Sequence, residues 1–251
     1  MKLNPAQNMK PLTDFPIPDR LAQRPRHKGI PIPFTTMLLP DGSPDFRVTD
    51  HERWLNCVDG DLCALCGEDL PPLNWYVGGD KCVESKMFFD PAMCLECAIY
   101  ALVVCPFLAM KKGYAAEGKA EERFNASGAE GEVRTSQTVS TAVPKQFFLF
   151  AATHMALVKI AQTDDVTIML PPDAVQAIIP VPNRREGRHF AEFIAGLGGV
   201  RDSLMKHVAV QLMVRCPHCQ RKTPVDESKG GSAVQVCQSC GNWYNFEEGE
   251  S

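Results

Sequence analysis

Two cysteine-containing segments, Cys63-Ala-Leu-Cys66-Gly67 and Pro91-Ala-Met-Cys94-Leu-Glu-Cys97, are the strongest indication of the fold in this sequence. Two residues between cysteines let both sulfurs reach one metal ion from a tight turn. Gly67 supplies the backbone freedom that such a turn needs and lets amides point at the sulfurs. Cys94 and Cys97 are three residues apart, so on a helix they share one face. Because four thiolates make one tetrahedral site, the two pairs predict one structural zinc ion.

The residues between the two pairs predict a β-hairpin. Two short strand-like stretches, 73–77 and 82–89, lie on either side of Gly78-Gly79-Asp80. A turn-borne cysteine pair, a hairpin and a helix-borne pair follow one another in the order of a treble clef. We therefore expect a treble-clef-like zinc module here.

The second pair is expected on a helix that covers residues 91–104. Asp90-Pro91 is a favoured start, since Asp caps helices and Pro is accepted at the first helical position. The helix should stop at Cys105, because Pro106 disfavours helical geometry in the residue before it. Free amides at the helix N-terminus would offset the negative charge of a Cys₄ zinc site.

Two alternatives stay open for the cysteines of this region. The four paired cysteines can be buried structural residues without a metal, although paired spacing at a helix start favours metal. Cys57, Cys82 and Cys105 have no partner at metal spacing, and each is expected to be a small buried hydrophobe. Cys82 is close enough in sequence to compete as a ligand.

Short motifs across the first half of the chain also match a known pattern. The motifs are Gly29-Ile-Pro-Ile-Pro33, Pro44-Asp-Phe-Arg-Val48, Cys63-Ala-Leu-Cys-Gly67, Pro91-Ala-Met-Cys-Leu-Glu-Cys-Ala98 and Cys105-Pro-Phe-Leu108, with a weaker echo at Glu186-Gly-Arg188. Through them, the stretch from about Arg20 to Met110 resembles an uncharacterised family of small proteins in phages and actinobacteria. In many members of that family His stands where this chain has Cys94, and both residues are ordinary zinc ligands. The resemblance implies a phage or prophage setting and a zinc-held core, but no activity.

A second cysteine group lies near the C-terminus, outside that resemblance. Cys216-Pro-His-Cys219 and Cys237-Gln-Ser-Cys240 are separated by 17 residues, a usual distance for a Cys₄ zinc ribbon with one pair at each of two hairpin tips. Cys-Pro-His-Cys is also an active-site sequence of thioredoxin-like oxidoreductases, which require a helix that starts at the first cysteine. Pro224 and the absence of a βαβ pattern disfavour that alternative. A module of this size needs its metal in order to fold.

Composition sets limits on the function. The chain has 251 residues, 45% of them hydrophobic, and a formal net charge of -4. The acidic balance argues against a general binder of phosphate backbones. No apolar run is long enough to cross a bilayer, and residues 1–20 lack the apolar core of a secretory signal. Closely spaced cysteine pairs without a signal suit a reducing compartment, so a cytoplasmic location is expected.

The fold class predicted is α+β. The segments are a Pro-rich extended region (1–50, with nine prolines), the treble-clef-like module (51–110), a flexible linker (111–143), a small α+β region (144–213), the zinc ribbon (214–246) and an acidic tail (247–251). Within the α+β region, strands are expected in 147–160, 166–169 and 175–181. A helix is expected over 189–197, ended by Gly198-Gly199, and residues 202–213 suit either a strand or a helix.

The predicted function is that of a non-enzymatic adaptor that holds two structural zinc ions. No His-x-Glu, P-loop or dinucleotide motif is present, and both sites are closed Cys₄ sets. One alternative is an enzyme with a site in the middle region, around Arg184, Arg185, Glu186, Arg188 and His189.

A protein partner is favoured because the net charge is negative, and nucleic acid is the alternative. Single-stranded nucleic acid would bind through the ribbon, by charge on its basic residues and by stacking on Trp243, Tyr244 and Phe246. Nucleic acid of any kind would require the basic residues of the N-terminal segment and of the ribbon to lie on one face. The candidates are Arg20, Arg24, Arg26, Lys28, Arg215, Arg221, Lys222 and Trp243. The aromatic residues of the ribbon can instead pack its own small core.

Overall fold

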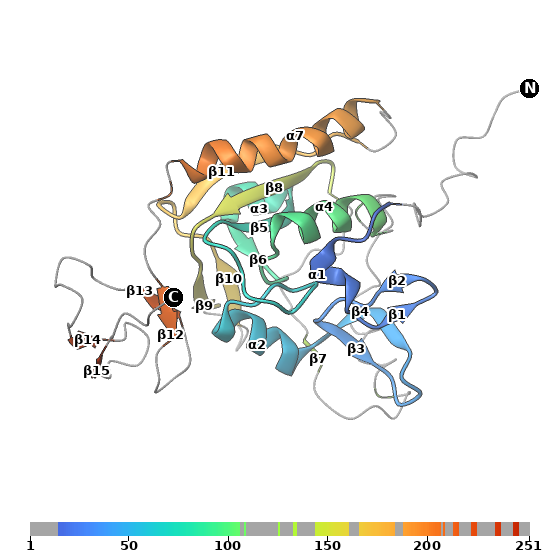
Figure 1. Ribbon diagram of the computed structural model, residues 1–251, viewed down its shortest axis with the longest axis horizontal. Helices are drawn as coiled ribbons and strands as arrows, with labels where there is room; N and C mark the ends of the chain where they lie inside the picture. Colours follow the sequence, from blue (N-terminus) through green and yellow to red (C-terminus); the bar gives the residue numbers. More distant parts are fainter. Residues whose placement is uncertain are drawn as a thin grey trace, which may run out of the picture.

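The computed structural model describes most of residues 15–208. The described residues are 15–105, 108, 125, 133–134, 144–160, 166–183, 188–206 and 208, together with short strands at 213–215, 222–224, 234–236 and 243–245. These residues form a mixed α and β fold with small antiparallel sheets and few helices (Figure 1). None of their helices is both long and apolar enough to cross a membrane.

A three-stranded antiparallel sheet forms the centre of the fold. Its order is β11-β8-β5, with β5 at Asn74–Gly79, β8 at Phe147–Ala152 and β11 at Val175–Pro180. The middle strand β8 reads Phe-Phe-Leu-Phe-Ala-Ala and is apolar on both faces. Because successive side chains of a strand point to opposite faces, each face of this sheet needs its own apolar layer.

Two helices cover the first face of this sheet. Helix α4 spans Leu95–Val104 and helix α7 spans Arg188–Met205 (Figure 1). The core on this face holds Trp75 of β5 and Leu149 and Ala151 of β8, each fully buried. On α7, Phe190, Phe193, Ile194, Leu197, Val200 and Leu204 belong to this core. Their spacing of three and four residues is that of one helix face.

A second small sheet and helix α2 cover the opposite face. This sheet has the order β6-β10-β9, from Met87–Phe88, Val166–Met169 and Ala156–Lys159, and α2 spans His51–Gly60. Its core is aromatic. Phe150 packs edge-on against Phe88 with ring centroids 4.9 Å apart, and Tyr76 lies 5.1 Å from Phe88. The Nε1 group of Trp54 donates a hydrogen bond of 2.7 Å to the Phe89 carbonyl, which ties α2 to this layer.

The N-terminal segment is more regular than its prolines predict. After helix α1 (Asp19–Ala22) it forms strands β1 (Arg26–His27), β2 (Ile30–Pro31), β3 (Thr36–Leu38) and β4 (Pro44–Asp50). The expectation of an irregular segment is wrong for residues 26–50, although the short strands there are extended as expected. Pro31 ends a two-residue strand and Pro44 starts β4, positions at which a missing amide costs little. β4 leads directly into α2, and the Asp50 side chain caps that helix by accepting from the Arg53 amide at 3.0 Å.

The hairpin predicted over residues 73–89 is wrong. Helix α3 (Asp80–Ser85) follows β5 directly, so β5 and β6 pair with β8 and β10 instead of with each other. Gly78 makes room for this turn, since a Cβ atom at that position would lie 2.7 Å from the Cys82 Cβ atom. β5 is apolar on both faces, and pairing with the apolar β8 buries both of them.

The helix predicted over 91–104 starts four residues late. Trp75 and Met93 exchange two backbone hydrogen bonds of 2.9 and 2.8 Å, which hold the chain extended up to Cys94. Asp90 and Pro91 therefore do not start α4, and Cys94 is its N-cap residue. The predicted stop at Cys105 is confirmed.

The strands predicted at 166–169 and 175–181 are confirmed as β10 and β11. The stretch 147–160 contains two strands, β8 and β9, rather than one. Helix α7 continues through Gly198-Gly199, where a stop was expected, because its apolar face continues to Leu204. The undecided stretch 202–213 begins as the last turn of α7.

Strand pairing joins regions that are distant in the sequence. β5 and β6 come from residues 51–110, and their partners β8 and β10 come from residues 144–213. Within the stretch expected to be a linker, β7 (Val133–Arg134) pairs with β4. The rest of that stretch lies outside the described residues, apart from residue 125.

Phe150→Ala should lower the free energy of unfolding by about 3–5 kcal/mol. Phe150 is fully buried on the central strand and contacts Phe88 across the aromatic layer. Leu157→Ala is the matched control, since Leu157 is 39% exposed. Urea unfolding of the metal-loaded protein measures both variants, and equal losses would contradict the assignment of this core.

Candidate metal centre

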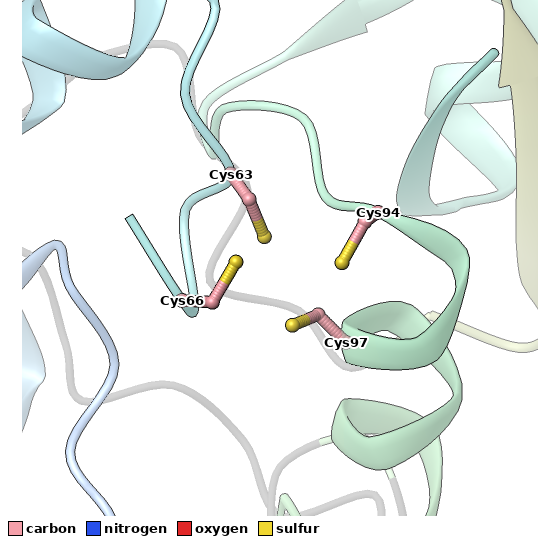
Figure 2. Close-up of side chains that lie close together, drawn as sticks. All are labelled: Cys63, Cys66, Cys94 and Cys97. Carbon is pink, nitrogen blue, oxygen red and sulfur yellow. The ribbon is translucent and has the colours of Figure 1, made fainter. Parts of the chain in front are cut away.

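Four cysteine sulfurs meet beside the N-terminus of α4. Cys63 and Cys66 lie on the turn after α2, while Cys94 is the N-cap of α4 and Cys97 lies in its first turn. Figure 2 shows the four side chains pointing toward a common centre. Their Sγ atoms all lie within 4.8 Å of one another. Zinc–sulfur bonds of about 2.3 Å in a tetrahedron place the sulfurs about 3.8 Å apart, so this arrangement fits a metal ion.

The cluster is part of the protein core. Cys63, Cys94 and Cys97 have no exposed surface, and Cys66 is 6% exposed. All four belong to the same core as Trp75 and the apolar face of α7. Four cysteine ligands satisfy a tetrahedral ion without an added water. The donor set is that of a structural site.

Backbone hydrogen bonds hold the turn that bears Cys63 and Cys66. The Cys63 amide donates to the Glu68 carbonyl, and the Gly67 amide donates to the Cys63 carbonyl, both at 2.8 Å. Gly67 has φ +76°, a conformation that side chains disfavour. The Ala64 amide donates to the Ala92 carbonyl at 2.9 Å and joins this turn to the segment before α4. The expectation that Gly67 serves a tight turn is therefore confirmed.

The N-terminal segment forms a wall of the site, which the sequence did not predict. The Phe34 amide donates to the Leu65 carbonyl at 2.9 Å, and the Thr35 amide donates to the Ala64 carbonyl at 3.2 Å. Leu21 of α1 is 1% exposed and packs in the same core as the four cysteines. The only signal for this contact was a set of apolar residues scattered among the prolines, namely Leu21, Ile32 and Phe34.

The start of α4 faces the cluster with its positive end. Cys94 has extended backbone angles and no side-chain cap, and its carbonyl accepts the first helical bond from the Ala98 amide at 3.0 Å. Amides in the first turn of a helix favour negative charge nearby. Glu96 in this turn is exposed and pairs at 3.1 Å with Arg201 of α7, so the site is tied to the helix layer.

Without a cation the four thiols do not ionise alike. Hydrogen bonds from the Cys66, Cys94 and Cys97 thiols lower the pKa of Cys63 below the usual thiol range. Hydrogen bonds with Cys63 and Cys66 raise the pKa of both Cys94 and Cys97. The hydrogen bond with Cys63 raises the pKa of Cys66, but hydrogen bonds from Cys94 and Cys97 outweigh it and lower this pKa to about 7, so the cluster favours thiolates on the turn over thiolates on α4. A divalent cation favours the deprotonated form of every thiol that coordinates it.

The other described cysteines lie apart from this cluster. Among the described residues, only Cys63, Cys66, Cys94 and Cys97 come close enough together to hold a metal ion, so Cys82 is not a fifth candidate. Burial raises the pKa of the Cys57 thiol on α2 and of the Cys82 thiol on α3. Cys57 is 2% exposed, as expected for a small hydrophobe, whereas Cys82 and Cys105 are half-buried.

The second cysteine group lies outside the described residues. Strands β12 (Met213–Arg215) and β13 (Lys222–Pro224) pair with each other, as do β14 (Val234–Val236) and β15 (Trp243–Asn245). In the sequence, Cys216 and Cys219 lie between the first two strands, and Cys237 and Cys240 lie between the second two.

The residues considered for nucleic acid differ in their surroundings. Arg20 and Arg24 are half-buried and bond to the protein, whereas Arg26 and Lys28 are exposed. Arg215, Lys222 and Trp243 occupy positions in β12, β13 and β15. Arg221 lies outside the described residues.

The residues considered for an enzyme site are only partly described. Arg188 and His189 are exposed at the start of α7. Arg184, Arg185 and Glu186 lie outside the described residues.

No family model, no curated protein and no solved structure matches this chain. The resemblance to a phage and actinobacterial family therefore stays a prediction, and the function is argued from the site alone.

Gly67→Ala should lower the free energy of unfolding by about 2–4 kcal/mol. An added Cβ would meet an unfavourable φ and would lie 2.7 Å from the Phe34 ring. Gly42→Ala is the matched control, because Gly42 has φ +79° but nothing within 4 Å of the added atom. Urea unfolding separates the two effects, and an equal loss in both variants would contradict the contact between Phe34 and the cysteine turn.

Proposed function

We propose that this protein is a non-enzymatic adaptor held together by structural zinc, and that it binds a partner protein. The observation that supports this most is the buried, all-cysteine donor set. A catalytic zinc usually keeps three protein ligands and one open position. Cys63, Cys66, Cys94 and Cys97 leave no ligand position open, so the ion would serve to join segments of the chain.

The first zinc would hold three segments in one arrangement. Cys63 and Cys66 position the turn after α2, Cys94 and Cys97 position α4, and Phe34 and Thr35 attach the N-terminal segment to the turn. A cysteine turn that faces a helix with ligands at its start would correspond to a treble clef in which α3 and two separate strands replace the hairpin. The four thiolates orient these segments, and the ion supplies the bonds between them.

The second zinc would form a ribbon from the C-terminal cysteines. The antiparallel pairs β12–β13 and β14–β15 support this part of the proposal, because a ribbon places one cysteine pair between the strands of each hairpin. The redox alternative needs a helix at Cys216, whereas strand β13 begins at Lys222, six residues after Cys216.

A protein partner is favoured by charge and by exposed apolar side chains. The net charge of -4 disfavours contact with a phosphate backbone. Among the described residues, four large hydrophobic side chains are more than a third exposed, and a partner protein would bury apolar surface of this kind. They are Phe46, Leu55, Met87 and Leu157. With the phage setting that the resemblance implies, we expect a bacterial host protein as the partner, met in the cytoplasm.

Single-stranded nucleic acid is the second candidate, and one surface of the N-terminal segment favours it. Phe46 is 42% exposed, and its ring lies edge-on to His27 with centroids 6.3 Å apart. Arg26 and Lys28 are exposed on either side of His27 in the sequence. Aromatic rings with neighbouring cations bind bases by stacking and phosphates by charge.

Purified protein should contain two zinc ions per chain, and the Cys63→Ser and Cys216→Ser variants should contain one each. Loss of one thiolate leaves a three-ligand site whose affinity falls steeply. Elemental analysis after exhaustive dialysis measures the metal content. Cys57→Ser is the control and should keep both ions. Protein without bound metal would refute the proposal as a whole.

The two kinds of partner can be separated with labelled oligonucleotides. If the second candidate is right, a single-stranded 20-mer should bind at low salt, and its affinity should fall steeply as salt rises. Phe46→Ala should then weaken binding roughly tenfold by loss of one stacking contact. Leu55→Ala is the control on a different element. Absence of binding at low salt would leave the protein partner, which affinity capture from host lysate would then identify.

A further inference from the structure

A zinc ion on four thiolates has a net charge of −2, and this protein buries that charge in its core. Uncompensated charge in such a place is costly, so the surroundings must supply positive potential. The first-turn amides of α4 supply part of it. The source of the remaining positive potential matters only if the zinc site proposed above exists.

Arg20 of α1 lies against the turn that bears Cys63 and Cys66. Its Nε group donates to Glu68 Oε2 at 2.8 Å, and its Nη2 group donates to the Asp69 carbonyl. The next residue, Leu21, is 1% exposed within the same core as the four cysteines. The Arg20 side chain is itself only 29% exposed. These contacts hold the guanidinium in a fixed orientation against the residues that follow Cys66 on the turn.

The electrostatic interactions of Arg20 reach both cysteine pairs. Burial alone would lower the pKa of Arg20, but attraction to the sulfurs of Cys94 and Cys66 and the bond to Glu68 outweigh it, so the pKa is raised. One of these sulfurs belongs to the turn and the other to α4. The guanidinium therefore favours negative charge on one sulfur of each pair.

Arg24 is the rival for this role, and its contacts suit it less. It interacts with Cys66 only, while burial and repulsion from Arg53 lower its pKa. Its Nε group donates to the Ile32 carbonyl at 3.1 Å, and its guanidinium lies over the Phe34 ring at 5.5 Å. Arg24 thus contacts other residues of the N-terminal segment, whereas Arg20 bonds to the residues just after the cysteine turn.

We propose that Arg20 is the charge-compensating residue of the metal centre and that Glu68 serves only to position it. The guanidinium stabilises the metal-bound, fully deprotonated cluster relative to the metal-free one. Arg20 would therefore be a positioning and electrostatic residue for the metal, instead of a contact for nucleic acid.

The test is zinc affinity, measured by competition with a chromophoric chelator. The parent is the full chain with Cys216→Ser and Cys237→Ser, which under the proposed function keeps only the first zinc. Arg20→Gln, Arg20→Lys and Glu68→Gln are compared with this parent. Arg26→Gln, the removal of an exposed arginine on the neighbouring strand β1, is the matched control. A parent without zinc would refute the zinc site itself and not the role of Arg20.

Arg20→Gln should weaken zinc binding roughly tenfold, as expected for one nearby charge at a partly buried site. Arg20→Lys keeps the charge and should stay within about threefold of the parent. Glu68→Gln removes a competing negative charge, so zinc should bind as tightly as before or more tightly. Arg26→Gln should change nothing.

Two outcomes would overturn the assignment. Parent-like affinity in Arg20→Gln would show that the guanidinium does not act on the metal. A loss in Glu68→Gln as large as in Arg20→Gln would show that the ion pair only clamps the turn. If Arg20→Gln fails to fold, Arg20→Lys and Glu68→Gln still separate the two roles. Both variants disrupt the contact between Arg20 and Glu68, and both keep a positive charge at position 20.

Discussion

The convergence of four buried sulfurs is the constraint on which the rest of this structure depends. Each sulfur must reach one centre, so the turn after α2 and the first turn of α4 must approach each other closely. Their approach sets the position of Trp75, whose strand pairs with the segment just before α4. β5 extends from that point and directs β8 and β11 beside it. The four cysteines of the candidate metal centre are therefore part of the main core and do not form a separate module.

The central strand β8 transmits this constraint through the molecule. Its alternate side chains belong to two separate cores, one under α4 and α7 and one against α2 and the second sheet. Leu149 and Ala151 share a core with the four cysteines, whereas Phe150 shares one with Trp54 and Phe88. Because β8 is buried on both faces, it connects the two cores. A change at the four cysteines should therefore alter the stability of both cores.

The surroundings of the cluster suggest why the N-terminal segment is folded at all. The segment has too few apolar residues for a core of its own, and its strands contain two to seven residues. Its contacts with the cysteine turn, through Arg20, Phe34 and Thr35, attach it to the larger core. In return it covers the turn, and Arg20 places positive charge against the residues that follow it. Stability of the segment and stability of the cysteine turn are thus linked properties.

Local sequence chemistry was sufficient for the ligand set and for several elements. The spacing of Cys63, Cys66, Cys94 and Cys97 needed no tertiary information, because two intervening residues constrain the sulfurs on any turn or helix start. The stop at Cys105 and the strand at β10 also followed from short-range rules. The predicted start of the helix was wrong because Met93 pairs with Trp75. The predicted hairpin was wrong because β5 pairs with the apolar strand β8, about 70 residues away in the sequence.

The sequence by itself determined which residues can hold the metal and that the fold mixes helices with short strands. The folded structure was needed to show which strands pair, that α7 extends past Gly198-Gly199, and that Arg20 bonds to the residues just after the cysteine turn. The physical reason is the range of the interactions concerned. Ligand spacing and helix caps act over a few residues, whereas burial and charge compensation depend on segments that meet only when the chain is folded.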